Sequence, residues 1–372
     1  MRFRTRELGI KIGTMTTGPS NTINDVNGVK VGHETIIKGE GPYIRGEGPV
    51  RTGVSVIFPH SGDTYMERVP AAMEWLNGFG ECLGYSFVQE FGFIIGPIVI
   101  TSSFNVYRVA DALQDWSIEE HPEVGFISHG LICVVCECSD DWLNDIQGRH
   151  VHREHVFSAI NNASSEPCQE GSVGAGTGMI AFEWKGGIGT SSRVIPLEFG
   201  GFTLGVMVVS NFGADEQLII NGVPIGNELS VPYPPIPADK EGSCVIVIAT
   251  DAPFSSRQLR KLAKRAFFGL ARTGGTGRNG SGDLAIAFST SNKISRDPVS
   301  IADTRTVVHE FSDETLNNLF NATVEATEEA ILNSMFTSDT MVGRDNNIVH
   351  GLPIPEVIQI MNRYGNKLKL PE

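Results

Sequence analysis

The sequence predicts a layered α/β fold in which two stacked β-sheets lie between layers of helices. Several predicted strands are apolar at nearly every position instead of at alternate positions, which is typical of strands covered on both faces. Amphipathic helical segments lie between these strands and supply the covering layers. A chain of 372 residues with 41% hydrophobic and 19% charged residues is consistent with one globular domain with a sizeable core.

Seven segments are predicted to be strands, because short apolar runs lie there between turn-forming residues. In chain order they are residues 53–58, 93–100, 131–137, 179–184, 202–210, 244–250 and 284–289.

Four segments are predicted to be helices. One has Ser255 or Ser256 as its N-cap and stops at Gly274, with an apolar stripe between them. A second has Ser312 as its N-cap and acidic residues in its first turn. Shorter helices are predicted over residues 104–116 and 151–163.

Charge and cysteine usage narrow the possible partners. A net charge of −14 disfavours binding to nucleic acid and to anionic membranes. The sequence has no membrane-spanning apolar run and no secretory signal, so a cytoplasmic location is expected. Cys133, Cys136 and Cys138 lack a second ligand cluster, so they are interpreted as small buried strand residues, with Cys133 facing away from the other two. No metal or organic cofactor is predicted.

Two glycine clusters, residues 171–184 and 274–283, are typical of tight turns. The second contains G-x-G-x-x-G, but both clusters precede a strand, whereas a dinucleotide fingerprint opens a helix. They are interpreted as turns, or as loops whose backbone N–H groups approach a reacting centre.

The segment 221–242 resembles a linker, with five prolines, yet a core strand follows it directly. Ser243 opens that strand. An N-terminal serine has its own base, because its α-amine has a pKa of about 8. Gly242 would suit a break before it, since glycine tolerates a strained turn and leaves its carbonyl unhindered. On these residues alone, an ordinary Gly-Ser turn is the simpler interpretation.

Several motifs in the same order give the chain a wider resemblance. They include "NTINDVNGVKVGHETI", "VVCECSDDWLNDIQG", "GSVGAGTGM", "LGVMVVSNFG", "GSCVIVIATDAP" and "NGSGDLAIAFST". With these motifs the chain resembles, nearly end to end, the L-aminopeptidase/D-esterase and β-peptidyl aminopeptidase family of self-processing N-terminal-nucleophile hydrolases. The resemblance implies a four-layer α/β/β/α sandwich and homo-tetramers of αβ units. It also implies one catalytic domain, cut into residues 1–242 and 243–372.

The resemblance also implies catalytic roles. Ser243 matches the nucleophile, and the bond after Gly242 matches the one that is cleaved. Asn211 matches the asparagine whose amide helps to form the oxyanion hole. Ser281 and Asp283 match a hydroxyl–carboxylate pair around the nucleophile, although some members have glutamate at the position of Asp283.

Two further positions match the substrate-binding part of the family. Glu137 matches the carboxylate that holds the free amine of the substrate. A carboxylate at the end of a buried strand needs a cation, which is either that amine or an arginine of the chain itself. Ser139 stands where some members carry an aromatic residue, so a wider pocket is expected.

The implied reaction is hydrolysis of an N-terminal aminoacyl amide, ester or short peptide through an acyl-enzyme on Ser243. The aminoacyl group is L-α, D-α or β. Three alternatives remain open at this point: an acyltransferase of the ornithine acetyltransferase type, a hydrolase of ω-amino-acid (nylon-type) oligomers, and an uncleaved binding protein on the same fold.

Overall fold

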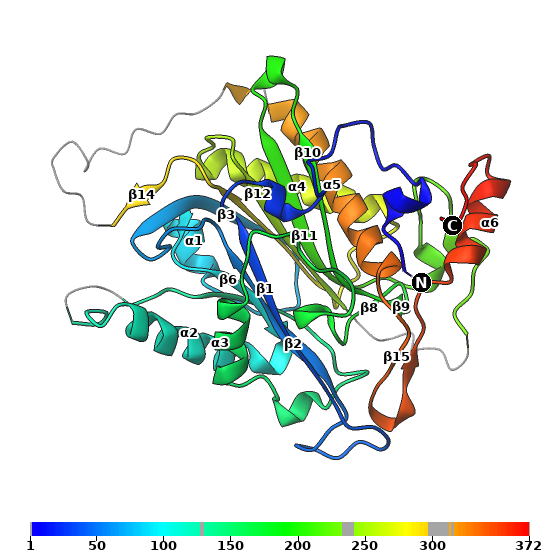
Figure 1. Cartoon of the computed structure of the whole chain (residues 1–372), viewed down its shortest axis with the longest axis horizontal. Coiled ribbons are helices and arrows are strands. Elements are labelled where there is room, and N and C mark those ends of the chain that lie inside the picture. The colour runs from blue at the N-terminus through cyan, green and yellow to red at the C-terminus, as the bar shows by residue number, and fades with distance from the viewer. Residues whose placement is uncertain (1, 127–129, 233–241, 297–311, 314–315, 372) are drawn as a thin grey trace.

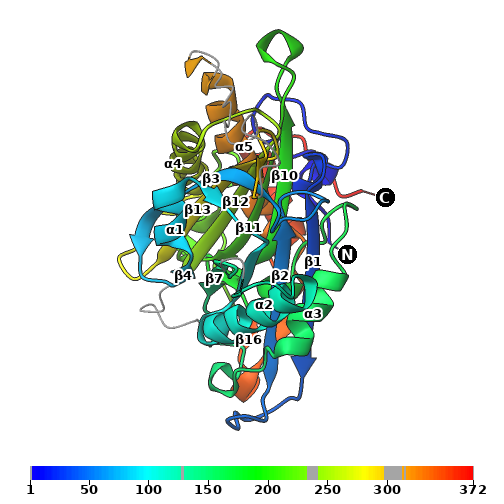
Figure 2. The same ribbon diagram turned by 90° about the vertical axis from the view of Figure 1, so that its left-hand side faces the viewer.

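The structure is a computed structural model, and it describes residues 2–126, 130–232, 242–296, 312–313 and 316–371. Two β-sheets stack face to face, and helices cover the outer face of each (Figures 1 and 2). The predicted α/β/β/α order of layers is therefore confirmed.

The first sheet has five strands and is covered by two helices. Its strand order is β1-β2-β6-β7-β4. The bounds are Lys30–Lys38 for β1, Val50–Phe58 for β2, Cys82–Leu83 for β4, Ile98–Ser102 for β6 and Val134–Cys138 for β7. Helices α2 (Val106–Glu120) and α3 (Arg153–Asn161) bury their apolar faces against its outer side.

The second sheet contains the chain's most apolar strands. Its order is β10-β11-β12-β13-β3-β14, and β5 also pairs with β3. The bounds are Glu67–Gly78 for β3, Phe93–Ile94 for β5, Gly187–Val194 for β10, Thr203–Asn211 for β11, Ser243–Thr250 for β12, Gly282–Ser289 for β13 and Ile294–Ser295 for β14. Helices α4 (Ser256–Arg272) and α5 (Leu316–Phe336) cover its outer face.

Strand β12 shows why these strands are apolar at every position. Val245 and Val247 face the first sheet, while Cys244 and Ile246 face the helices α4 and α5. Both faces of the strand are therefore removed from water, as the sequence pattern predicts for a doubly covered strand.

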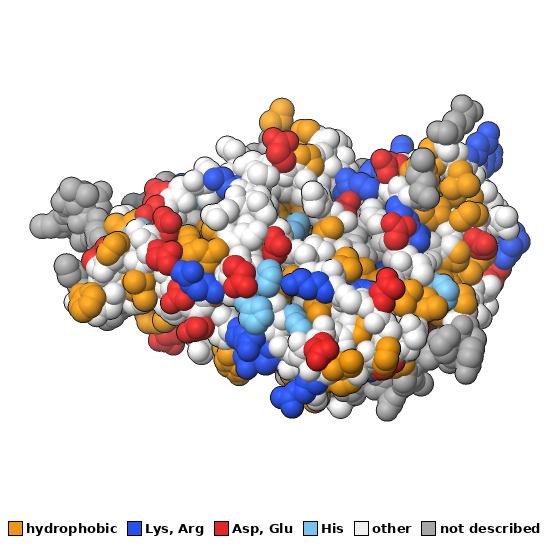
Figure 3. All heavy atoms as spheres, turned by 60° about the horizontal axis from the view of Figure 1, so that its bottom comes forward, with side chains coloured by type: hydrophobic (Ala, Val, Ile, Leu, Met, Phe, Trp, Pro, Cys, Tyr) orange, Lys and Arg blue, Asp and Glu red, His pale blue; other side chains and the backbone are white. Residues whose placement is uncertain are grey.

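Smaller elements complete the fold. They are α1 (Tyr85–Phe91), α6 (Ile354–Arg363) and the short hairpins β8 (Ile180–Ala181) with β9 (Trp184–Lys185) and β15 (Met341–Val342) with β16 (Ile348–Val349). No helix of the described residues is long and apolar enough to cross a membrane. On the face in Figure 3, acidic side chains lie among basic ones.

Helix α4 follows the prediction closely. Its N-cap is Ser255, its predicted apolar stripe is buried, and Gly274 lies just beyond its end with a positive φ of +99°. Between Ser312, the predicted N-cap, and the start of α5 at Leu316 lie residues 314–315, which are outside the described residues.

Two strand predictions need correction. Residues 93–100 do not form one strand, because the chain turns at Gly96 and Pro97 and its halves, β5 and β6, join different sheets. Residues 179–184 do not form a central strand either, since they fold into the small β8–β9 hairpin.

Three long strands, β1, β3 and β10, are missing from the prediction. The middle of β10 reads Thr-Ser-Ser-Arg, which is polar, yet the strand is almost entirely buried. Its polar groups are satisfied individually: the Ser191 hydroxyl donates to the Ala326 carbonyl, and the guanidinium of Arg193 pairs with Glu325 and Glu329.

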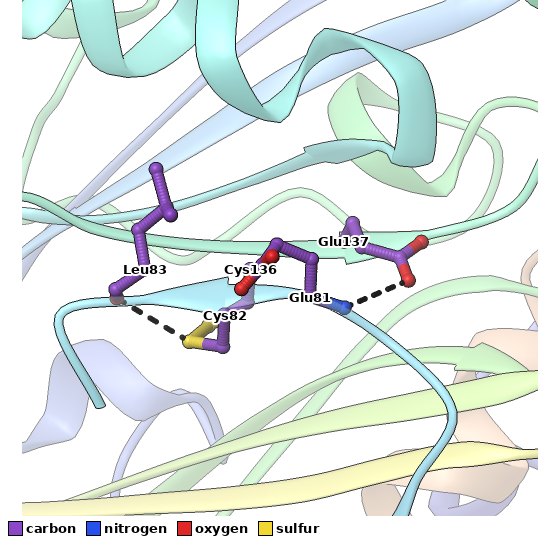
Figure 4. Close-up of a disulfide and its surroundings, with 5 residues drawn as sticks. All are labelled: Glu81, Cys82, Leu83, Cys136 and Glu137. Carbon is purple, nitrogen blue, oxygen red and sulfur yellow. Dashed lines mark hydrogen bonds between the residues drawn. A yellow bond between two sulfur atoms is a disulfide. The ribbon is translucent and has the colours of Figure 1, made fainter. Parts of the chain in front are cut away.

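Cys133, Cys136 and Cys138 are buried as predicted, and one of them forms a disulfide that the sequence does not predict. Cys136 and Cys138 face the inter-sheet core and Cys133 faces the helices α2 and α3. Cys82 of β4 and Cys136 of β7 form a disulfide between paired strands (Figure 4).

Candidate active site

Ser243 lies at the start of a central strand and faces a cavity. In the ladder it stands opposite Asn211 of β11 on one side and Gly282 of β13 on the other. Its side chain is buried, with 3% of the residue exposed, and its Oγ has no nitrogen or oxygen partner among the described residues; the side chain next to it is the buried Cys138 thiol. The cavity has a volume of about 700 Å³, and Ser243 and Gly242 line it. A buried hydroxyl without such a partner is costly, which is typical of a group kept for chemistry.

Close packing requires a glycine at position 242. A Cβ at this position would lie 1.9 Å from the Asn211 carbonyl oxygen, so no larger residue fits. Its φ is not in the left-handed region, so the expected strained turn is absent and close approach is what requires glycine. The Gly242 carbonyl accepts a hydrogen bond of 3.0 Å from the Gly282 N–H, which polarises the bond before Ser243.

Asn211 is held at both ends of its amide. Its Oδ1 accepts from the Ile180 N–H at 2.9 Å, and its Nδ2 donates to the Ser139 carbonyl at 2.9 Å. An amide has two N–H groups, and the second has no acceptor among the described residues. Because Asn211 stands opposite Ser243 in the ladder, this N–H lies on the nucleophile's side of the sheet.

Ser281 and Asp283 form the predicted pair. The Ser281 hydroxyl donates to Asp283 Oδ1 at 2.8 Å, and Asn77 Nδ2 donates to the other carboxylate oxygen at 3.3 Å. Burial raises the pKa of Asp283, while its hydrogen bonds, including one from the Cys244 backbone, lower it.

The strand register decides on which face of the sheet this pair lies. Ser243 stands opposite Gly282, so its side chain shares the face of Gly282. Asp283 follows Gly282 in β13, so alternation puts its side chain on the other face, where the Ser281 hydroxyl bonds it. Cys244 stands opposite Asp283 in the ladder, on that same face. The pair therefore lies on the opposite face of the sheet from the Ser243 side chain.

Glu137 is a half-buried carboxylate in the cavity wall. Ser103 donates its hydroxyl to Oε2, and the Glu81 N–H donates to Oε1 at 3.2 Å (Figure 4). Burial is the main reason that the pKa of Glu137 is raised. No Lys or Arg nitrogen of the described residues lies within 4.0 Å of it, so the internal arginine partner considered from the sequence is not found there.

Ser139 also lines the cavity, as predicted. Its hydroxyl donates to Asp141 Oδ1 at 3.0 Å, and its carbonyl accepts from Asn211. Ser139 thus lines the substrate side of the cavity and also bonds Asn211, which belongs to the predicted oxyanion hole.

Sequence reasoning missed four residues that shape the site: Asn77, Gly80, Ser103 and Asp141. Gly80 packs between Glu137 and the start of β13. A Cβ at Gly80 would lie 3.0 Å from Glu137 Oε1 and 3.3 Å from the Gly282 Cα. The one available signal was the glycine-rich turn over residues 78–80, which is typical of close backbone approach.

Comparisons with known proteins show what the whole chain is similar to. The model of Peptidase family S58 matches residues 21–349. The beta-peptidyl aminopeptidase BapA of Sphingosinicella xenopeptidilytica is 43% identical over 375 residues, which cover 96% of this chain and 90% of that protein.

Solved structures match over almost the whole chain. The crystal structure of a protein from Pyrococcus horikoshii OT3 has a TM-score of 0.93 and 46% identity, covering 98% of this chain and 100% of that one. The L-aminopeptidase D-Ala-esterase/amidase of Ochrobactrum anthropi, described as a variant of the Ntn hydrolase fold, has a TM-score of 0.90 and 36% identity, covering 97% and 99%. The chain therefore belongs to peptidase family S58 and is a serine aminopeptidase with an N-terminal-nucleophile-hydrolase-like fold.

Proposed function

We propose that the chain cuts itself between Gly242 and Ser243 and then uses Ser243 as the nucleophile of an aminopeptidase. The observation that carries this proposal is the buried Oγ of Ser243, which has no nitrogen or oxygen partner among the described residues and faces a cavity at the start of a central strand. The hydrogen bond from the Gly282 N–H to the Gly242 carbonyl supports the cleavage step, because it stabilises an oxyanion at that carbonyl.

The self-cleavage proceeds in two steps. The Ser243 hydroxyl attacks the Gly242 carbonyl carbon, and the C–N bond breaks as the Ser243 nitrogen takes up the proton. This leaves an ester between Gly242 and Ser243 Oγ. Water then hydrolyses the ester, which gives a Gly242 carboxylate and a Ser243 with free α-amine and hydroxyl.

The two fragments form one domain after the cut. Strands β12 and β13, from residues 243–372, lie between β11 and β3, from residues 1–242. Separating the fragments would expose both ladders and the inter-sheet core, which keeps them together without a covalent bond.

In the aminopeptidase reaction, the α-amine of Ser243 takes the hydroxyl proton as Oγ attacks the substrate carbonyl. The second N–H of Asn211 and backbone N–H groups stabilise the oxyanion. The amine then protonates the leaving group, and water releases the acyl group from Ser243. Ser281 and Asp283, on either side of the residue opposite Ser243, act on the amine.

Glu137 selects substrates with a free amine. Its carboxylate is desolvated and has neutral donors only among the described residues, so a substrate ammonium supplies the missing cation. The substrates are aminoacyl amides, esters and short peptides. The beta-peptidyl aminopeptidase BapA and the L-aminopeptidase D-Ala-esterase/amidase are named for β-peptidyl, L-aminoacyl and D-alanyl substrates. We assign this range of substrates to the chain.

The rival functions are not favoured by the family match. A homo-tetramer of αβ units and a cytoplasmic location stay predictions. The tip between β10 and β11 projects from the body, and its Leu197 is 89% exposed, which suits burial against another copy (Figure 2).

Trapping the acyl-enzyme tests the proposal. Processed enzyme quenched in acid during turnover of an aminoacyl ester should carry the mass of the acyl group on residues 243–372, at Ser243. Ser243→Ala should carry none. An acyl group on another residue, or turnover by Ser243→Ala, would contradict the assignment of the nucleophile.

A further inference from the structure

Lys185, in the β8–β9 hairpin, is a buried lysine with no acidic partner. Its side chain is fully buried, and no carboxylate of the described residues forms an ion pair with it. Burial lowers the pKa of Lys185 to about 7. Because burying a charge without a counter-ion is costly, a lysine at this position is expected to have a role beyond filling space.

The Lys185 amine bonds three backbone carbonyls. Its Nζ donates to Gly186 at 2.8 Å, to Met179 at 2.9 Å and to Gly176 at 3.2 Å. A neutral amine has only two N–H groups, so three acceptors favour the charged form. Each carbonyl also has a second donor, and these donors are the Ser338 hydroxyl, the Gly186 N–H and the Met179 N–H, in the same order. The ammonium is therefore not needed to satisfy the backbone.

One of these carbonyls belongs to the peptide unit that holds Asn211. The carbonyl of this unit, on Met179, accepts from Lys185 Nζ at 2.9 Å. Its N–H, on Ile180, donates to Asn211 Oδ1 at 2.9 Å. The C=O and N–H of a trans peptide point in opposite directions in one plane, so Lys185 and Asn211 bond the two ends of the same unit. A cation at the carbonyl polarises the peptide and makes its N–H a stronger donor.

This hydrogen bond decides which way the Asn211 amide is turned. The Ile180 N–H requires an oxygen beside it, and the Ser139 carbonyl requires an N–H. An amide turned the other way round would place Oδ1 where the second N–H now lies, and Oδ1 would repel an oxyanion. Because that N–H lies on the side of Ser243, the orientation decides whether Asn211 can stabilise an oxyanion there.

We propose that Lys185 is a positioning residue for the oxyanion hole, whose ammonium orients and polarises the Asn211 amide through the Met179–Ile180 peptide. Lys185 is not among the residues that line the cavity, so it acts only through other groups. This inference rests on the proposed function, in which Asn211 stabilises the oxyanion. Since negative charge on the substrate oxygen develops in the transition state, Lys185 contributes to kcat more than to substrate binding.

The first test replaces Lys185 with methionine, which keeps an unbranched side chain and removes the ammonium. The fold should persist, because the three carbonyls keep their second donors. On processed enzyme, kcat for an aminoacyl p-nitroanilide should fall by about 10- to 100-fold, since misplacing a catalytic group by about 1 Å costs about 10²-fold. The KM should change by about twofold or less, as expected for a group that acts in the transition state.

The matched control is Ser191→Ala. It also removes a buried side-chain donor from a backbone carbonyl, that of Ala326 on α5, and leaves the bonds of Asn211 intact. Its kcat should equal that of the wild type. If Ser191→Ala lowers kcat as much as Lys185→Met does, the effect is a general response to lost buried hydrogen bonds and the inference is wrong.

The second test repeats Lys185→Met in an Asn211→Ala background. If Lys185 acts through Asn211, kcat should fall by only about twofold or less in this background. An equal fall in both backgrounds, or an unchanged kcat in Lys185→Met alone, would overturn the inference and leave the proposed function standing. Full kcat in Asn211→Ala would instead contradict the oxyanion role in the proposed function, and the inference with it.

Lys185→Gln takes both tests if the methionine variant yields no folded protein. Its amide keeps N–H donors and lacks the charge, so the same loss of kcat, confined to enzyme that retains Asn211, is expected. Folding is measured by circular dichroism and by urea unfolding. Failure of both variants to fold would make Lys185 a structural residue and would overturn the inference.

Discussion

Replacing Glu137 with glutamine keeps the shape of the cavity wall and removes one charge. The glutamine oxygen can still accept the Glu81 N–H, and its NH₂ group can donate to the Ser103 hydroxyl, which is able to accept instead of donate. The fold and the self-cleavage should therefore persist. What the variant loses is the charge-assisted hydrogen bond to the substrate ammonium, which contributes about 1.5–3 kcal/mol. Since 1.4 kcal/mol corresponds to about tenfold, kcat/KM for a free-amine substrate should fall by about 10- to 150-fold.

The assay measures kcat/KM for one aminoacyl p-nitroanilide and its N-acetyl derivative on both proteins. Wild type should discriminate between them by several hundredfold, because the acetylated amine leaves the half-buried Glu137 carboxylate without a cation, at a cost on the order of several kcal/mol. Glu137→Gln should lose most of this discrimination. If both proteins discriminate equally, Glu137 is structural and the amine is recognised elsewhere.

The pH profile gives the same variant a second readout. Burial raises the pKa of Glu137, so protonation on acidification neutralises the carboxylate at a higher pH than for an exposed glutamate. Wild-type kcat/KM for free-amine substrates should therefore fall as the pH drops through this raised pKa. Glu137→Gln should lack this acidic limb, and an identical limb in both proteins would assign it to another group.

Three other substitutions test the site and its support. Gly242→Ala should block self-cleavage, because its Cβ would lie 1.9 Å from the Asn211 oxygen; complete processing of this variant on denaturing gels would refute that packing argument. Asn211→Ala should lower kcat by about 10²–10³ with less effect on KM in processed enzyme, and an unchanged kcat would remove Asn211 from the oxyanion hole. Arg193→Met should lower the free energy of unfolding in urea by about 3–5 kcal/mol, since it leaves the Glu325 and Glu329 carboxylates without their buried partner; a loss below 1 kcal/mol would contradict this.

The elements at the centre of the fold could be predicted because the sequence signals for each lie within its own segment. Strands β11, β12 and β13 are continuous apolar runs, and α4 has a serine cap, an apolar stripe and a terminal glycine within one segment. Strand β10 could not be predicted in the same way. Its Ser191 and Arg193 are buried only because α5, more than 130 residues later, supplies their partners.

The candidate site also has some residues with a local sequence signal and some without one. Ser243, Asn211 and Glu137 each end or begin an apolar strand, and the family motifs mark them. Ser103 and Asp141 carry no local signal, because what matters is which side chains they meet across the cavity. The register of β12 against β13 is equally non-local, and it sets Ser243 opposite Gly282, next to Asp283.

The intact mass of the purified protein tests most directly whether the chain cuts itself before Ser243. We expect two fragments under denaturing conditions, residues 1–242 and 243–372, and a smaller fragment that begins Ser-Cys-Val-Ile. Ser243→Ala should remain one chain of 372 residues. A wild-type protein that stays intact while active, a cut at another bond, or cleavage that persists in Ser243→Ala would contradict it.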